Sequence, residues 1–130
     1  MARSVLLILL VAVLMPAACQ RPAPAGGSGS GGTDVVIDWV DFIVVGSTQY
    51  TAGMEGTPTV SDADLGPVAA HVKFKVDGNV CDPHYKPKDG DAAFLEPGTP
   101  IYAVTGHPTG KLLAARHDGN VVAYAALPGS

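Results

Sequence analysis

The fold is decided by the stretch Val68-Ala69-Ala70-His71-Val72-Lys73-Phe74-Lys75-Val76. Apolar residues occupy every second position from Val68 to Val76, whereas His71, Lys73 and Lys75 occupy positions between them. Because successive side chains of a strand point to opposite faces, this alternation predicts a half-buried antiparallel strand. Its apolar face is expected to contact the core, and its basic face to contact solvent.

The sequence on both sides of this strand is also typical of β-structure. Asp118-Gly119 favours a type I′ hairpin, Val45-Gly46 can form a turn, and residues 61–64 can form at most one helical turn before Gly66-Pro67. The further strands are expected over residues 35–45, 47–52, 92–95, 100–105, 111–116 and 121–125. About seven short strands without a long helix predict an all-β domain at residues 34–130, folded as a small antiparallel barrel or sandwich.

The N-terminal region has the features of an export signal. Arg3 precedes an apolar run of eleven residues, Val5 to Met15, which is too short for the roughly 20 residues of a membrane span. Ala17-Ala18-Cys19 then resembles a bacterial lipobox, in which residues 1–18 are removed and Cys19 receives a diacylglycerol. Pro16 stands where this pattern prefers leucine. The alternative is an ordinary secretory signal, because Ala23-Pro24-Ala25 also matches an A-x-A cleavage site.

The segment after Cys19 has the composition of a tether. Residues 20–25 are rich in proline, and residues 26–32 are only glycine and serine, which behave as a flexible coil. Residues 19–33 are therefore predicted to connect a lipid anchor to the domain. From Cys19 onward, seven Lys and Arg face twelve Asp and Glu. This acidic balance, without a basic cluster, argues against nucleic acid as a partner and predicts that membrane attachment comes from the lipid.

A longer pattern resembles a known family. It comprises Asn79-Val80, Asp82-Pro83 and Tyr85, then the runs Asp89-Gly90-Asp91-Ala92-Ala93-Phe94-Leu95 and Gly98-Thr99-Pro100-Ile101-Tyr102-Ala103-Val104-Thr105-Gly106. The region from Trp39 to Ala115 thereby resembles a family of small, largely uncharacterised bacterial lipoproteins. In that family an aromatic residue tends to follow the last glycine, where this chain has His107. The resemblance implies an exported, anchored β-domain on the outer side of a bacterial cell membrane, and it implies no particular activity.

Cys81 and His84 are the candidate metal ligands. A thiolate and an imidazole suit zinc or copper, but His71, His107 or His117 would have to converge with them to complete a site. The alternative is a cysteine packed as a small hydrophobe beside surface histidines. Asp89-Gly90-Asp91 could similarly approach one cation, although such a trio is more often a turn whose carboxylates accept backbone N–H bonds.

The functional hypotheses follow from these features. The leading one is a non-catalytic module, anchored in the membrane through Cys19, that binds a protein or envelope ligand and needs no cofactor. The candidate binding residues are Tyr85, Tyr102, His107 and Tyr124, because exposed aromatic side chains are frequent anchors. The alternatives are a zinc- or copper-binding lipoprotein and a secreted enzyme. For the enzyme, Cys81 and His84 would have to act as nucleophile and base, and the sequence offers them no orienting partner.

Overall fold

The computed structural model describes residues 37–129. The predicted signal peptide, Cys19, the tether and the beginning of the predicted strand at residues 35–45 lie outside the described residues. The described part is all-β, as predicted, and no helix in it is long and apolar enough to cross a membrane.

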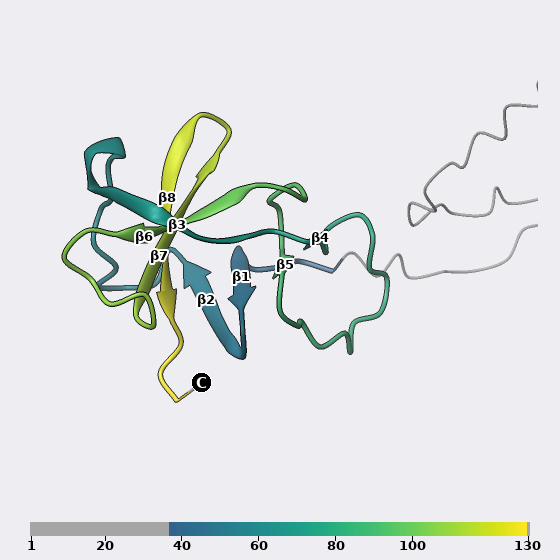
Figure 1. The fold of residues 1–130 in the computed structure, drawn as a ribbon. Helices are drawn as coiled ribbons and strands as arrows, with labels where there is room; N and C mark the ends of the chain where they lie inside the picture. Colours follow the sequence, from purple (N-terminus) through teal and green to yellow (C-terminus); the bar gives the residue numbers. More distant parts are fainter. Residues whose placement is uncertain (1–36, 130) are drawn as a thin grey trace, which may run out of the picture.

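Eight strands form one curled sheet in the order β3-β6-β7-β8-β2-β1-β5-β4 (Figure 1). All neighbours are antiparallel except β4 and β5, which are parallel. The strands are β1 (Phe42–Val45), β2 (Thr48–Ala52), β3 (Leu65–His71), β4 (Phe74–Lys75), β5 (Asp91–Ala92), β6 (Pro100–Val104), β7 (Leu112–His117) and β8 (Asn120–Ala126).

One continuous segment joins the two edges of this sheet. β3 forms one edge and β4 the other, and only Val72 and Lys73 separate them. The Val72 N–H donates to the Thr99 carbonyl (3.0 Å), whereas the N–H groups of Lys73 and Phe74 donate to the carbonyl of Gly90 (2.8 and 3.2 Å). The chain therefore leaves the β6 side and reaches the β5 side without a break in hydrogen bonding. This crossing draws the sheet into its curled form.

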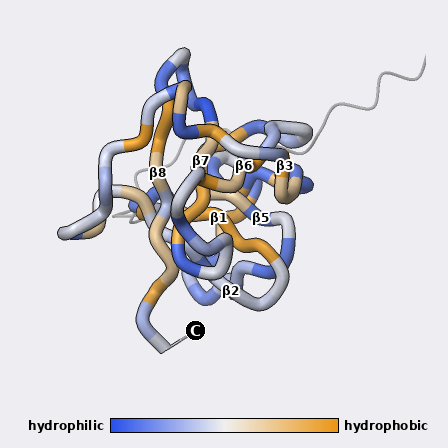
Figure 2. The backbone as a smooth tube through the Cα atoms, turned by 60° about the vertical axis from the view of Figure 1, so that its left-hand side comes forward, coloured by the Kyte–Doolittle hydropathy of each residue, from blue (hydrophilic) through white to orange (hydrophobic). Residues whose placement is uncertain are grey.

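The main core lies on the inner face of the curled sheet. Residues from six strands meet there, because alternate side chains of each strand point inward. The members of this cluster are Ile43, Tyr50, Val72, Ala92, Leu95, Ile101, Leu113, Ala115 and Tyr124. Hydrophobic stretches of the described residues accordingly run along β1, β7 and β8 (Figure 2).

The outer face of the sheet is also apolar, and two connecting segments cover it. The segment before β3 places Val60 against Val104, Leu112 and Ala114. At the other end, Trp39 and residues of the loop 77–90 pack on a cluster of Phe42, Val44, Val76 and Ala93. Because side chains on both faces of the sheet are buried, β1 and β7 consist of continuous apolar residues and do not alternate between apolar and polar residues.

Local sequence determines the two tight hairpins. Asp118 (φ 50°) and Gly119 (φ 79°) both have positive φ, which confirms the predicted type I′ turn between β7 and β8. Gly46 (φ 63°) begins the two-residue connection between β1 and β2, where only this first residue has positive φ. The predicted helical turn is present as a single 3₁₀ turn at Asp62–Asp64, where the Asp64 carboxylate accepts the Ser61 N–H (2.8 Å).

The predicted continuous alternation from Val68 to Val76 is wrong in part. Val72 and Val76 are buried as expected, but Val68 is 46% exposed and Phe74 is 36% exposed. Register irregularities interrupt the pairing of β3 with β6 between Leu65 and Ala70. Each irregularity changes which face the following side chain occupies, so a strict period of two cannot persist through the crossing segment.

Gly90→Ala should destabilise the protein more than Gly98→Ala. Both glycines have a φ of 88°, so a side chain at either costs about 1–2 kcal/mol in backbone strain. A Cβ at Gly98 would have nothing within 4 Å, whereas a Cβ at Gly90 would lie 2.5–2.8 Å from side-chain carbons of Lys73. We expect this overlap to add roughly 1–3 kcal/mol to the loss at Gly90. Urea unfolding of both variants measures the difference, and equal losses would contradict the close packing at Gly90.

Candidate functional site

The loop 77–90 holds Cys81, His84 and Tyr85, together with Asp89 and Gly90 of the Asp89-Gly90-Asp91 trio. Its anchor is Asp91, which is 2% exposed and lies directly after it. The Asp91 carboxylate accepts hydrogen bonds from the Tyr85 hydroxyl (2.7 Å) and the Lys88 N–H (2.9 Å). Asp89 accepts the Gly46 N–H (2.7 Å) and pairs with Lys73 (2.8 Å). The interpretation of Asp89-Gly90-Asp91 as a turn whose carboxylates accept backbone N–H bonds is thus confirmed.

Tyr85 is half-buried within this loop. Its ring packs edge-on against Trp39, with 6.4 Å between ring centroids, and Trp39 in turn packs against Phe42 at 6.3 Å. The Lys88 ammonium lies 5.3 Å from the Tyr85 ring centroid and 5.8 Å from that of Phe74. We refer to residues 37–41 and 73–92, which include β4, the loop 77–90 and β5, as the loop lobe. Tyr85 stabilises this lobe, and its hydroxyl is already engaged by Asp91.

Cys81 is exposed on the loop 77–90. The chain has one other cysteine, Cys19, which lies outside the described residues. Zinc and copper bind the deprotonated thiolate, so a metal site would need Cys81 in that form. An acyl-modified Cys19 and an intramolecular disulfide at Cys81 also exclude each other.

His84 is exposed, and its backbone N–H donates to the Asp82 carboxylate (2.8 Å). Within residues 37–129, no group of three His, Cys, Asp or Glu side chains has the geometry of a metal site. His71, His107 and His117 are therefore not brought together with Cys81 and His84 by the described fold. The metal hypothesis stays a prediction.

The other predicted binding residues lie apart from one another. Tyr102 is half-buried on β6, and His107 is exposed in the turn after it. Tyr124 was expected to be an exposed anchor, and this is wrong because its side chain is 0% exposed. Its place on the inner face of β8 puts the ring in the main core. The four residues do not form one concave surface.

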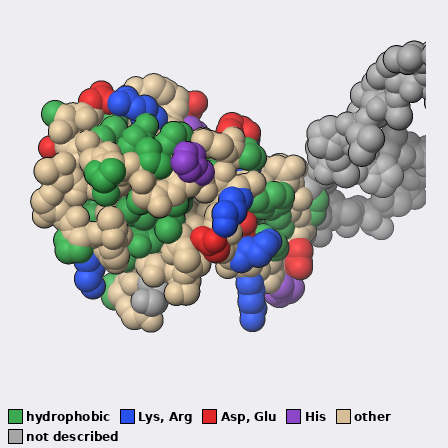
Figure 3. Space-filling model, viewed as in Figure 1, with side chains coloured by type: hydrophobic (Ala, Val, Ile, Leu, Met, Phe, Trp, Pro, Cys, Tyr) green, Lys and Arg blue, Asp and Glu red, His purple; other side chains and the backbone are tan. Residues whose placement is uncertain are grey.

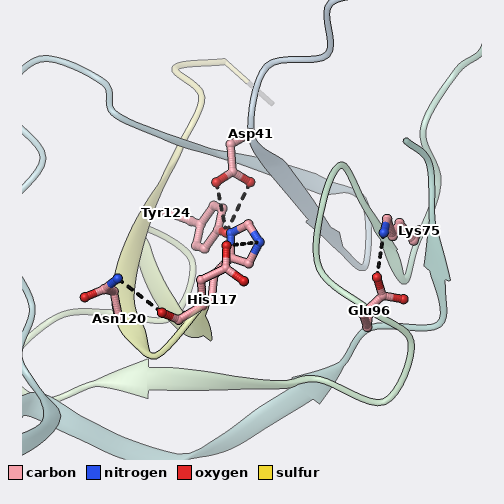
Figure 4. A network of polar contacts seen from close by, with 7 residues as sticks. Asp41, Lys75, Glu96, His117, Asn120 and Tyr124 are labelled. Carbon is pink, nitrogen blue, oxygen red and sulfur yellow. Dashed lines mark hydrogen bonds and ion pairs between the residues drawn. The ribbon is translucent and has the colours of Figure 1, made fainter. Parts of the chain in front are cut away.

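A polar cleft of about 330 Å³ lies at one end of the curled sheet. It is lined by charged and polar side chains over a small apolar floor, namely Lys75, Phe94, Leu95, Glu96, Thr99, Arg116, His117 and Asp118. Lys75 and Glu96 form an ion pair on one side of the cleft, and His117 lies on the other side (Figure 4). Asp118 lies beside His117. The Glu96 carboxylate raises the pKa of Lys75, so this amine is cationic at neutral pH.

A half-buried acid, Asp41, lies beside this cleft. The Tyr124 hydroxyl donates to both carboxylate oxygens of Asp41, at 3.2 and 3.3 Å (Figure 4). Burial raises the pKa of Asp41, although the Tyr124 hydrogen bond and the charge of His117 oppose this shift. Burial and the nearby Asp41 also raise the pKa of Tyr124, so the phenol remains protonated and acts as the donor.

A second depression, of about 310 Å³, contains His107. Residues of the segment after β2 form one side of it, and Lys111, Leu112 and the end of β8 form the other. Thr57 lines this depression, and its Oγ1 is buried without a hydrogen-bond partner. Apart from His107, the titratable residues that line this depression are Glu55 and Lys111. The polar cleft has two basic residues, two acidic residues and a histidine in its lining, so it offers more groups that can bind a polar ligand.

Sequence reasoning missed most of the polar cleft. Lys75 was predicted only as a solvent-facing strand residue, and Asp118 only as part of a hairpin turn. No sequence pattern near Glu96 or Arg116 indicates a binding site. The residues around them do not show that β4, the segment after β5 and the end of β7 lie close together in the fold. The cleft exists only because the sheet curls.

Comparison with protein-family models, with characterised proteins and with solved structures finds no match for this chain.

Replacing Asp41 and Asp89 by asparagine should change the pH dependence of stability in opposite directions. Asp41 has a raised pKa, so its favourable contribution is complete below its ordinary pKa and is lost as pH rises through the folded-state pKa. Asp89 has a pKa lowered by Lys73 and the Gly46 N–H, so its contribution is present above its ordinary pKa and is lost as pH falls.

Thermal melts between about pH 3 and pH 7 measure this contrast. Relative to the wild type, Asp41→Asn should gain melting temperature as pH rises, and Asp89→Asn should lose it. The Asp89 effect should be the smaller one, because its side chain is half exposed and solvent screens its ion pair. If the melting temperatures of both variants, relative to the wild type, changed in the same direction as pH rises, the opposite pKa shifts assigned to Asp41 and Asp89 would be wrong.

Proposed function

We propose that this protein is a bacterial lipoprotein whose β-domain stands outside the cytoplasm and acts as a non-catalytic binding or envelope-support module. The observation that carries the proposal is the order of segments in the sequence. A short apolar leader ends at Ala17-Ala18-Cys19, a glycine- and serine-rich tether follows, and the folded domain comes only after it. The resemblance of residues 39–115 to a family of small lipoproteins agrees with this order.

The architecture of the described domain suits such a module. A tether allows a small domain to reach a partner while it remains attached to the lipid surface. The polar cleft is the concave surface that we propose for binding, since it combines an ammonium, a guanidinium and two carboxylates over an apolar floor. A cleft with both signs of charge favours a ligand group that also carries both signs or several hydrogen-bonding atoms.

Cys19→Ala should abolish membrane attachment. Stable anchoring requires two or more acyl chains, which only a modified cysteine provides here. The measurement is detergent phase partitioning of the wild type and the variant after expression in a bacterium. The wild type should enter the detergent phase, and the variant should remain unprocessed or in the aqueous phase. Aqueous partitioning of both proteins would refute the lipoprotein proposal.

Maleimide labelling of the membrane-extracted wild type provides an independent control. If Cys19 carries lipid, Cys81 cannot be bridged to it and should react with maleimide after denaturation without reductant. Labelling that requires reductant would identify a disulfide at Cys81 and would favour an ordinary secretory signal. Cys81→Ser should partition like the wild type, because the lipid attachment does not involve residue 81.

The alternative, a zinc- or copper-binding lipoprotein, has a distinct test. If Cys81 and His84 hold a metal, the purified protein should contain it in near-stoichiometric amount, and a chelator should lower its melting temperature. Our proposal expects no bound metal and no chelator effect. It also expects Cys81→Ser/His84→Ala to melt close to the wild type, measured without reductant and again with reductant. A metal-dependent melting temperature in the wild type that the double variant lacks would establish the alternative.

A further inference from the structure

The surface of the loop lobe combines exposed apolar side chains with lysines. Val40 is 62% exposed and Phe74 is 36% exposed, and these are two of the three exposed large hydrophobic residues among residues 37–129. Lys73, Lys86 and Lys88 are exposed on the same lobe. Basic side chains gather there beside hydrophobic surface in the space-filling view (Figure 3).

Charge is distributed unevenly over the described domain. The loop lobe contains four lysines and six aspartates, of which Asp91 is buried and Asp41 is half-buried. Among its exposed side chains, three lysines (Lys73, Lys86 and Lys88) balance three aspartates (Asp38, Asp82 and Asp89). Elsewhere in the described domain, only Lys111 and Arg116 oppose Glu55, Asp62, Asp64, Glu96 and Asp118. The exposed surface of the lobe is therefore close to neutral, whereas the rest of the domain has an acidic excess. An anionic surface would tolerate the lobe and repel the remainder.

The chain enters the domain at this lobe. The first described residue is Ile37, and the coloured chain begins beside β5 and the loop 77–90 (Figure 1). Trp39, two residues later, is packed against Tyr85 and Phe42 of the lobe. Thirty-six residues precede this point, and they include the proposed anchor and tether. The end of the domain that is nearest to the tether in sequence is therefore also the end with lysines and exposed apolar groups.

We propose that the loop lobe docks on the anionic lipid headgroups of the membrane to which the chain is anchored. In this orientation Val40 and Phe74 contact the interfacial region, and Lys73, Lys86 and Lys88 lie near lipid phosphates. Long lysine side chains can place their ammonium groups in the headgroup layer while apolar groups pack below them. The acidic remainder of the domain, including most of the polar cleft, then faces away from the lipid. This inference rests on the proposed lipid anchor.

The single tryptophan makes the orientation measurable. Trp39 is the only tryptophan in the chain and belongs to the loop lobe. The full-length lipidated protein is reconstituted in vesicles of phosphatidylcholine, with or without about one-third phosphatidylglycerol, whose acyl chains carry bromine as a fluorescence quencher. We expect stronger quenching of Trp39 in the vesicles with phosphatidylglycerol. The difference should disappear near 1 M salt, where the Debye length falls to about 3 Å.

Lys86→Glu and Lys111→Glu form a matched pair of variants. Both reverse one exposed lysine, but residue 86 belongs to the loop lobe and residue 111 lines the second depression. In vesicles with phosphatidylglycerol, Lys86→Glu should reduce the quenching of Trp39 to about half, and Lys111→Glu should leave it close to the wild type. Thermal melts of both variants establish that each is folded before the comparison.

Vesicle flotation separates this inference from the proposed anchor. If the protein floats with the vesicles but Trp39 is quenched equally in both lipid mixtures, the anchor is retained and the docked orientation is overturned. Equal quenching in the Lys86→Glu and Lys111→Glu variants would also overturn it. If the lipidated preparation does not float at all, the lipoprotein proposal fails, and the docking of the lobe fails with it.

Discussion

The peptide groups on both sides of Gly90 hold the curled sheet together. The Gly90 N–H donates to Val44 of β1 (2.9 Å), and the Gly90 carbonyl accepts from Lys73 and Phe74 at the start of β4. Its positive φ and the lack of room for a Cβ beside Lys73 require glycine at this position. Without these bonds, the segment after β3 would lose its first contacts with the β5 edge and would depend on the later bonds from Val76 and Asp77 to Ala92 and Ala93.

The crossing also determines where the two functional surfaces lie. Lys73 pairs with Asp89 and Phe74 lies beside Lys88, whereas Lys75, the next residue, lines the polar cleft and pairs with Glu96. These three consecutive residues thus contribute both to a surface proposed to face lipid and to a cleft proposed to bind a ligand. A change in the register of this segment would alter both surfaces together.

The sequence predicts well those features that depend on neighbouring residues. Asp118-Gly119 determines its hairpin by local conformational preference, and the all-β class follows from the short apolar runs between turns. The crossing was not predicted, because it depends on contacts between Lys73 and Gly90 that no local pattern reveals. Tyr124 was misplaced for a related reason, since an aromatic residue in a strand does not indicate which face of the sheet covers it. The polar cleft depends on the same long-range contacts.

The strongest motif in the sequence has a structural explanation that needs no ligand. In Asp89-Gly90-Asp91, the glycine permits the crossing, and the two carboxylates hold the β1 hairpin turn and the loop 77–90. Folding alone accounts for these residues, so they are poor guides to function. Folding does not account for the exposure of Val40 and Phe74, because both leave apolar area in water and fill no core cluster. Side chains whose exposure the fold does not require are the better guides, and two of the three such large apolar residues among residues 37–129 lie on the lobe where the chain enters the domain.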